Sequence, residues 1–578
     1  MRYAARAWVA LAGLLAASAC SSMQLAEKSA KTPAKQNAAR PAARAASGPF
    51  GSPAEQLMYQ ALVAEIALQR GELAIAVDNY AAVVRSTQDA AAAQRTVQIA
   101  MFARNYDAAL AAAKVWAAQQ PSQEDARRVL AVLYLRKGES DKAVETFASV
   151  LATKKEDLAD SYYQIGALLR RELDKSVAVG VMERLVKLHP ESPEAAYSLA
   201  TIYMWASADD QARTQAERVL KLKPDWPDAV SLKARAMHAS GDTKGAIGYL
   251  KDYLQRQPKD ALVRFDYARM LVDSRRFEEA RAQYDILHKQ QADNEEALYA
   301  LGVLSMQFKD YKEAETYFTQ LFELGKRTDH AAYYLGELAD QNKKYDAALT
   351  WFERVQAGEF RLDAALRAAN IVQRRNGVEA ARERLRSIQV FNPQERREVI
   401  LAEGALLRDA KRLKDALDVY TRGLADNKDD TKLLYARALV AERLDKLDMA
   451  EADLKAILAH EPDNASVLNA LGYTLADRTS RYPEALKLIA HALELQPNDP
   501  AFLDSMGWIQ YRLSNFDKAL EYLKKAIELA NDGEIAAHLG EVLWVSGRQD
   551  EAIKVWRSAR QNFSDNEALI KVMQRYGQ

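Results

Sequence analysis

The residues that could perform catalysis or bind a metal are few and scattered in this sequence of 578 residues. Its histidines lie at His189, His238, His288, His330, His460, His491 and His538. No two of them are four residues apart, so the sequence lacks a helical zinc-protease motif. There is one cysteine, and no glycine-rich phosphate-binding loop or G-x-S-x-G turn. We therefore predict a non-catalytic protein with no metal and no cofactor.

Recognition of another protein is a different kind of chemistry, and one stretch near the C-terminus fits it. The segment DSMGWIQYRL, residues 504–513, places Trp508, Tyr511 and Arg512 close to Gly507. Tryptophan, tyrosine and arginine contribute most of the binding energy at protein interfaces. Whether these side chains bind a partner depends on the elements that hold them.

Those elements follow from a repeat that begins near residue 57. One register contains alanine in every repeat, at Ala76, Ala109, Ala143, Ala178, Ala212, Ala246, Ala280, Ala314, Ala348, Ala381, Ala416, Ala450, Ala485, Ala519 and Ala552. The spacing is nearly constant, with a mean of about 34 residues, which is typical of helix-turn-helix solenoids.

Three other registers follow the same period. A small residue such as Gly302 or Gly507 lies 12 residues before the alanine, and a bulky one such as Phe318 or Leu523 lies four residues after it. Proline often closes the repeat, as at Pro462. Two helices approach closely only where side chains are small, and proline ends a helix because it lacks the N–H. The pattern predicts two antiparallel helices per repeat.

This pattern resembles the tetratricopeptide repeat (TPR) family. The resemblance implies an all-α fold, a right-handed superhelical solenoid of about 15 helix-turn-helix repeats over residues 53–566. The segment EALIKVMQRYG, within residues 567–578, is expected to form a helix that caps the open end, because a solenoid exposes apolar surface at its ends.

The resemblance also implies where a ligand would bind. In this family the first helix of each repeat lines a concave groove, mainly through its second, fifth, ninth, twelfth and thirteenth positions. In the last three repeats these positions include Asn469, Tyr473, Asp504, Trp508, Tyr511, Arg512, Glu541 and Trp544. We predict that this group forms a protein-binding groove. The alternative is that these side chains pack against the next repeat or the capping helix.

The N-terminus has the composition of an export signal. Arg2 and Arg6 precede a short apolar segment, and the only cysteine, Cys20, follows in LLAASAC. This arrangement resembles the lipobox of bacterial lipoproteins, in which the cysteine is lipidated after cleavage. We therefore expect a lipoprotein signal peptide at 1–19 and a lipidated Cys20. A plain secretory signal with an unrelated cysteine is the alternative.

The segment from Cys20 to Ser52 is rich in alanine, lysine and proline and has little to bury, so it is expected to form a disordered tether. The whole chain has 80 basic and 80 acidic residues. This balance gives no electrostatic basis for binding nucleic acid, and nothing in the sequence predicts a small-molecule substrate.

A more specific resemblance covers LNALGYTLADRTSRYPEALKLIAHALELQPNDPAFLDSMGWIQYRL and EIAAHLGEVLWVSGRQDEA. These segments are similar to the C-terminal region of outer-membrane TPR lipoproteins of Gram-negative bacteria. One branch of these is the partner of a periplasmic carboxyl-terminal processing protease and brings peptidoglycan hydrolases to it. The resemblance implies a lipid-anchored adaptor on the periplasmic face of the outer membrane. The alternative is an assembly scaffold for a pilus, secretin or polysaccharide-export machine.

Overall fold

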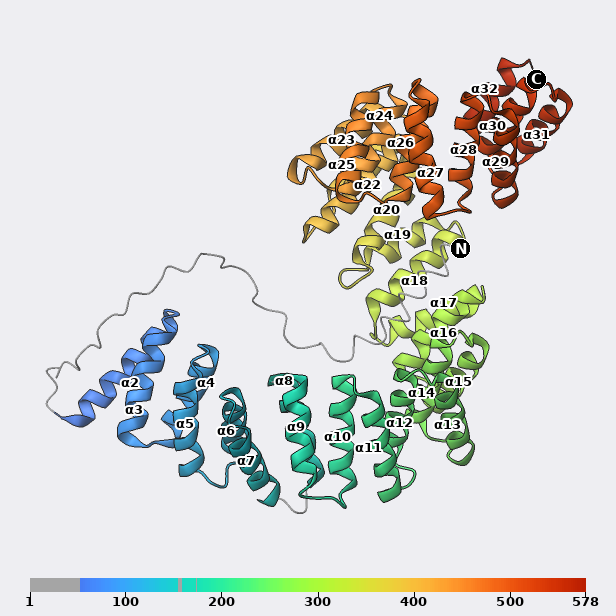
Figure 1. Cartoon of the computed structure of the whole chain (residues 1–578). Coiled ribbons are helices and arrows are strands. Elements are labelled where there is room, and N and C mark those ends of the chain that lie inside the picture. Colours follow the sequence, from blue (N-terminus) through green and yellow to red (C-terminus); the bar gives the residue numbers. More distant parts are fainter. Residues whose placement is uncertain (1–51, 154–157, 173, 578) are drawn as a thin grey trace. The chain divides into compact units, whose positions relative to one another are not determined.

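A computed structural model describes residues 52–153, 158–172 and 174–577 of the chain. Within these ranges the regular secondary structure consists of helices, with no strand (Figure 1). The predicted all-α class is confirmed. The predicted signal peptide, Cys20 and nearly all of the predicted tether lie outside the described residues.

The chain divides into two compact parts, Met1–Leu324 and Gly325–Gln578. We call their helical portions the N-terminal array and the C-terminal array. The helices of the N-terminal array are α2 (Pro53–Gln69), α3 (Leu73–Thr87), α4 (Ala90–Phe102), α5 (Tyr106–Gln119), α6 (Glu124–Arg136), α7 (Ser140–Thr153), α8 (Leu158–Glu172), α9 (Lys175–Val186), α10 (Pro193–Ala206), α11 (Asp209–Leu222), α12 (Pro227–Ala239), α13 (Thr243–Arg256), α14 (Ala261–Asp273), α15 (Phe277–Gln290), α16 (Glu295–Gln307) and α17 (Tyr311–Glu323).

The C-terminal array contains the candidate site. Its helices are α18 (Thr328–Gln341), α19 (Tyr345–Glu353), α20 (Arg361–Asn376), α21 (Val378–Arg386), α22 (Pro393–Asp409), α23 (Leu413–Asp426), α24 (Thr431–Arg443), α25 (Leu447–His460), α26 (Ala465–Arg478), α27 (Tyr482–Leu495), α28 (Pro500–Arg512), α29 (Phe516–Leu529), α30 (Gly533–Val545), α31 (Gln549–Asn562) and α32 (Glu567–Arg575).

Each repeat consists of an even-numbered first helix and an odd-numbered second helix, which cross at the small residue that the period identifies. A Cβ atom on Gly507 in α28 would lie 2.5 Å from Cγ of Leu523 in α29, and one on Gly302 in α16 would lie 2.7 Å from the Phe318 ring in α17. These distances leave no room for a side chain. The glycines are therefore explained by helix packing alone.

Local sequence determines where the helices begin. Several first helices follow an aspartate or asparagine whose side chain accepts a backbone N–H of the first turn, as Asn464 does from Val467 and Asp499 does from Phe502. Proline occupies the first position of α28, where its missing N–H costs nothing.

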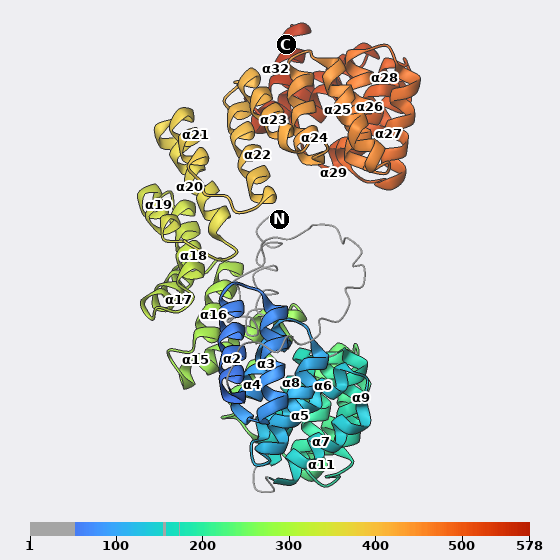
Figure 2. The same ribbon diagram turned by 90° about the vertical axis from the view of Figure 1, so that its left-hand side faces the viewer.

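The C-terminal array also brings together segments far apart in sequence. Lys411, in the turn between α22 and α23, lies 2.7 Å from Glu567 at the start of α32. Figure 2 gives a second view of the C-terminal array, turned by 90° from Figure 1. The last helix therefore contacts a repeat that lies far before it in the sequence.

Candidate functional site

The predicted groove residues lie on three consecutive first helices. Helix α26 provides Asn469 and Tyr473, and α28 provides Asp504, Trp508, Tyr511 and Arg512. Helix α30 provides Glu541 and Trp544. Side chains one period apart lie on neighbouring first helices, so residues of different repeats meet. They form two groups. One group is centred on α28, and the other lies under the capping helix α32.

The first group surrounds a buried ion pair. Nδ1 of His538 in α30 lies 2.9 Å from Oδ2 of Asp504, and both side chains are buried. The imidazole ring stacks on Trp508 with ring centroids 4.2 Å apart. Its Nε2 lies 3.4 Å from the Tyr473 hydroxyl. The histidine therefore joins α26, α28 and α30.

The charge of His538 depends on opposing effects. Burial alone would lower its pKa, but the Asp504 carboxylate, with Glu534 and Asp477 nearby, raises the pKa to about 9. The imidazole is therefore protonated at neutral pH and makes a charge-assisted contact with Asp504. Burial raises the pKa of Tyr473 far above its usual range, so this hydroxyl keeps its proton.

Trp508 and Arg512 of this group are also bound within the chain. Trp508 Nε1 donates to Asp477 Oδ1 over 3.2 Å. Arg512 donates to the Asp477 carbonyl and to the Tyr482 hydroxyl, each over 2.9 Å, and its guanidinium lies over the Tyr482 ring. These contacts fix α28 against the end of α26 and the start of α27.

The second group is covered by the end of the chain. Glu541 is buried and accepts from Arg575 Nη1 over 2.8 Å and from the Tyr576 hydroxyl over 3.3 Å. The ring of Trp544 packs against the rings of Trp556 and Tyr576. Helix α32 thus lies over this end of the array, in the place where the sequence predicts a capping helix.

Asn469 differs from the rest of the predicted set. Its Oδ1 atom is enclosed and has no hydrogen-bond partner among the described residues. Tyr473, Tyr511 and Trp544 are half-buried, and Trp508 is buried. The structure therefore brings the predicted residues together in clusters with extensive intramolecular contacts. Their role in binding a partner stays a prediction.

Sequence reasoning missed three residues of this site: His538, Asp477 and Tyr482. His538 follows Asp504 by one repeat. A search for opposite charges one period apart would have found this pair, because such residues lie on adjacent first helices. Asp477 and Tyr482 lie at the end of one helix and the start of the next, where the groove positions give no signal.

A more open surface lies on the first helices α22, α24 and α26. Leu401, Tyr435 and Asn469 follow one another at intervals of one repeat, and so do Ala405, Leu439 and Tyr473. We call these six residues the groove strip. Leu439 is 36% exposed, and the others are intermediate in exposure. The groove strip is therefore a half-exposed, mostly apolar surface that ends at the unsatisfied Asn469 oxygen.

The geometry defines an all-α repeat protein. Among the described residues, no group of three or more His, Cys, Asp or Glu side chains is arranged to hold a metal ion. In the same ranges, no helix combines the length and apolar character needed to span a bilayer.

Comparison with known proteins assigns the family. Tetratricopeptide repeat families match residues 95–157, 160–192, 177–236, 237–304 and 286–564. The TPR repeat-containing protein PA4667 of Pseudomonas aeruginosa is 32% identical over 495 residues, covering 85% of this chain and 83% of that protein. This chain belongs to the tetratricopeptide repeat family.

Other similarities are shorter or structural only. Cellulose synthase operon protein C of Pseudomonas fluorescens is 28% identical over 141 residues, which cover 23% of this chain and 11% of that protein. The APC/C hetero-tetramer Cut9–Hcn1 has a similar chain at 13% identity, covering 84% of this chain and 96% of that chain, with a TM-score of 0.29.

Proposed function

We propose that this protein is a non-catalytic adaptor that binds extended polypeptides along the groove strip. The observation that carries the proposal is the enclosed Asn469 oxygen at the end of the half-exposed apolar residues. A buried acceptor without a partner costs free energy. Because the Asn469 residue as a whole is half-exposed, rotation of its carboxamide would bring this oxygen to a ligand N–H at the surface. A peptide backbone supplies such a donor, and its side chains would cover Leu439 and Tyr435.

The buried cluster of Asp504, Trp508 and His538 has a supporting role in this proposal. It joins α26, the last helix of the groove strip, to α28 and α30, through contacts that leave few polar atoms for a ligand. A rigid surface loses less conformational entropy on binding. Tyr511, which is half-buried beside Trp508, would contact the ligand at its edge.

The proposed location and partners extend the resemblance to outer-membrane TPR lipoproteins. In this proposal Cys20 is lipidated, the tether crosses part of the periplasm, and the arrays recruit a carboxyl-terminal processing protease and its peptidoglycan hydrolase substrates. The similarity to a TPR protein of a Gram-negative bacterium, over most of both chains, supports this setting.

A second candidate is an assembly scaffold for an exporter of polysaccharide. The match to cellulose synthase operon protein C favours it, although the match covers only 141 residues. Both candidates use the same solenoid, so the identity of the bound proteins separates them.

The test is affinity capture from periplasmic extract with the mature chain, followed by mass spectrometry. Leu439→Glu would place a charge in the groove strip, and Leu495→Glu at the end of α27 is a matched control with 42% exposure. We expect a processing protease and wall hydrolases to be captured by the control but at least about tenfold less by Leu439→Glu. Capture of synthase or secretin subunits would instead support the scaffold, and equal capture by both variants would exclude the groove strip.

A separate test addresses the anchor. Cys20→Ala should move the protein from the outer-membrane fraction to the soluble periplasmic fraction, because lipidation supplies the membrane affinity in this proposal. Persistent membrane association of the variant would contradict lipid anchoring through Cys20.

A further inference from the structure

Helices α21 and α22 depart from the geometry of the repeats that follow them. Helix α21 has 9 residues, whereas the second helices α23 and α25 have 14 each. Helix α22 has 17 residues and α24 has 13. Helix α22 starts about three turns before its crossing residue Gly404, whereas α24 starts about two turns before Ala438. About one helical turn is thus lost at the end of α21 and gained at the start of α22.

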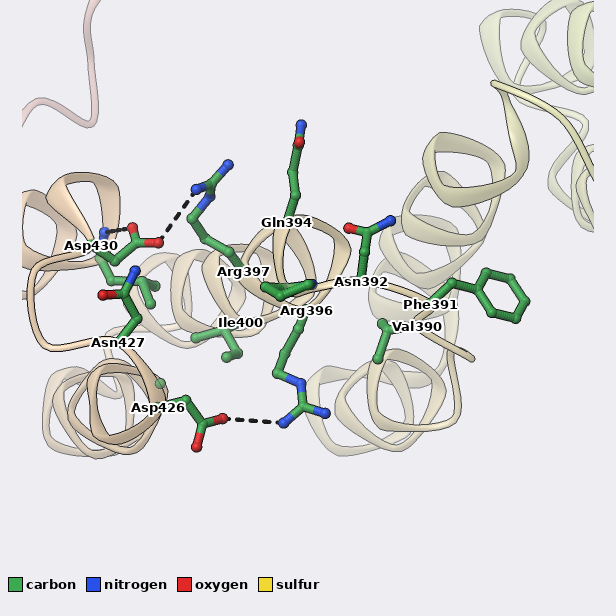
Figure 3. Close-up of a pocket in the computed structure, with 13 residues that line it drawn as sticks. Val390, Phe391, Asn392, Gln394, Arg396, Arg397, Ile400, Asp426, Asn427 and Asp430 are labelled. Atoms are coloured by element: carbon green, nitrogen blue, oxygen red, sulfur yellow. Dashed lines mark hydrogen bonds and ion pairs between the residues drawn. The ribbon is translucent and has the colours of Figure 1, made fainter. Parts of the chain in front are cut away.

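The shifted turn leaves a cavity of about 650 Å³ beside α22. Its walls are the connection before α22, the first turns of α22, the end of α23 and the start of α24 (Figure 3). On its floor, a Cβ atom at Gly423 would lie only 2.9 Å from Ile400 Cγ2, so the glycine permits α23 to approach α22. The cavity therefore depends on two local features, the early start of α22 and Gly423, which the repeats that follow do not combine.

The charged side chains of the cavity are already paired. Arg396 Nη1 lies 3.1 Å from Asp426 Oδ2, and Arg397 Nη1 lies 3.3 Å from Asp430 Oδ2. Figure 3 shows both pairs bridging the first turns of α22 to the ends of the neighbouring helices. Two arginines and two aspartates leave the lining without net charge. An anionic ligand would meet the aspartates, and a cationic ligand would meet the arginines.

The remaining lining combines apolar groups with carboxamides. Val390, Ile400 and Leu433 provide apolar surface. Three carboxamide side chains also line the cavity: Asn392, Gln394 and Asn427. The oxygens of Asn392 and Asn427 already accept backbone N–H groups, so these two side chains offer amide N–H donors, whereas Gln394 offers donors and an acceptor. An apolar surface with a few neutral polar groups is typical of sites that accept a small ligand or a protruding side chain.

We propose that this cavity receives an uncharged apolar side chain of a polypeptide, with the adjacent peptide groups meeting the three carboxamides. The neutral lining argues for an uncharged ligand, and the carboxamides match the donors and acceptors of a peptide backbone. Phe391, which is 65% exposed and points away from the other lining side chains, extends the apolar surface outside the cavity (Figure 3).

This site is separate from the groove strip. It lies at the ends of α22, α23 and α24, whereas the groove strip uses the middle of the first helices. The proposal therefore adds a second protein contact and does not depend on which partner the groove strip binds. Loss of one site should leave the other intact.

The test uses N-acetyl-leucinamide as a probe of an apolar side chain with its two peptide groups. The full mature chain carries labelled isoleucine methyl groups, and Ile400→Val identifies the Ile400 signal. We expect millimolar N-acetyl-leucinamide to shift the Ile400 methyl signal in a saturable way. N-acetyl-lysinamide and the corresponding glutamate derivative should bind at least about tenfold more weakly.

Two exposed positions provide the variant and its control. Asn427→Trp fills the cavity from its rim, whereas Lys428→Trp adds the same side chain next to it, outside the lining. The shift should be lost in Asn427→Trp and kept in Lys428→Trp. Gln394→Trp, also exposed, blocks the opposite rim and should act like Asn427→Trp. No saturable shift in the unmodified chain, equal affinity for the charged probes, or an unchanged shift in both blocking variants would overturn the proposal.

Discussion

The contact of α28 with α30 and the contact of α21 with α22 both contain a buried carboxylate, but they differ in what surrounds it. Asp504 meets a single buried histidine that is enclosed by Trp508 and Tyr473. Glu403 in α22 accepts from Arg382 over 3.1 Å and from Arg386 over 2.7 Å, and the Arg386 side chain is half-exposed. One pair is sealed by aromatic rings, and the other reaches solvent.

The apolar cores beside these contacts differ in the same direction. Next to α30 the core includes Leu523, Leu539, Trp556 and Val572, whereas next to α21 it is a small cluster centred on Ala381, Leu385 and Leu406. Aromatic rings cover the Asp504–His538 pair, whereas the half-exposed Arg386 leaves the Glu403 contact open to water. The cavity lies next to the second kind of contact.

The largest expected effect comes from breaking the sealed pair. Asp504→Ala leaves the imidazole of His538 buried without its carboxylate, which should cost about 3 kcal/mol. Backbone amides of α28 and α30 should then exchange hydrogen about 100-fold faster, because local opening becomes easier. Hydrogen exchange read by mass spectrometry tests this.

Asp517→Ala, on the exposed side of α29, is the matched control and should leave exchange in α28 and α30 nearly unchanged. Equal exchange in Asp504→Ala and in the unmodified chain would mean that the pair contributes no stability.

The second effect is a dependence on pH that should be confined to the sealed contact. The folded pKa of His538, about 9, lies above its ordinary value of about 6.5. Its protonation therefore stabilises the fold fully below about pH 6.5, and the stabilisation is lost as pH rises through about 9. The loss over this window should approach about 3 kcal/mol. No such change is expected for α21 and α22, since arginine keeps its charge there.

Two measurements check this dependence. Titration of the His538 imidazole by NMR should give a midpoint near pH 9. Hydrogen exchange in α28 and α30, corrected for its intrinsic pH dependence, should become faster across the same window. A midpoint near the ordinary histidine value would show that Asp504 does not hold the proton.

The two contacts also differ in how much of them could be predicted from sequence. The repeat period correctly predicted the helix pairs and the crossing at Gly507, because register and residue size determine which side chains can meet. It also predicted groove positions for Trp508 and Arg512, and their role in binding a partner stays a prediction. It did not reveal Asp477 or Tyr482, because large side chains reach beyond their own position into the ends of neighbouring helices.

The repeat period could not predict the shifted turn at α21 and α22, for a different reason. Ala416 follows Ala381 at the ordinary repeat spacing, so the register continues without a visible break. Register fixes the middle of a helix, whereas capping and packing fix its ends. Asn392 followed by Pro393 is a strong start signal for a helix, and it marks the early start of α22.

A third and smaller effect should come from the hydrated contact. Glu403→Ala releases Arg382 and Arg386, but Arg386 already reaches water, so the cost should be only about 1 to 2 kcal/mol. Exchange should become faster in α21 and α22 and stay unchanged in α28 and α30. Glu383→Ala, at an exposed position of α21, is the control. A loss as large as that of Asp504→Ala would remove the distinction between the two contacts.

The smallest effect on stability is expected at Asn469, at the end of the groove strip next to the sealed cluster. Asn469→Leu removes an enclosed oxygen that has no hydrogen-bond partner among the described residues, so the free energy of unfolding should stay equal or rise by up to about 1 kcal/mol. Binding of a captured partner should nevertheless weaken, because the acceptor for its backbone N–H is gone. Denaturation of the variant and its affinity for that partner are both measured.

Asn531→Leu, at an exposed site beyond α29, controls for the added apolar side chain. Reduced stability with unchanged affinity would mean that Asn469 serves packing alone, whereas equal or higher stability with lost binding would show that its oxygen is kept for a ligand.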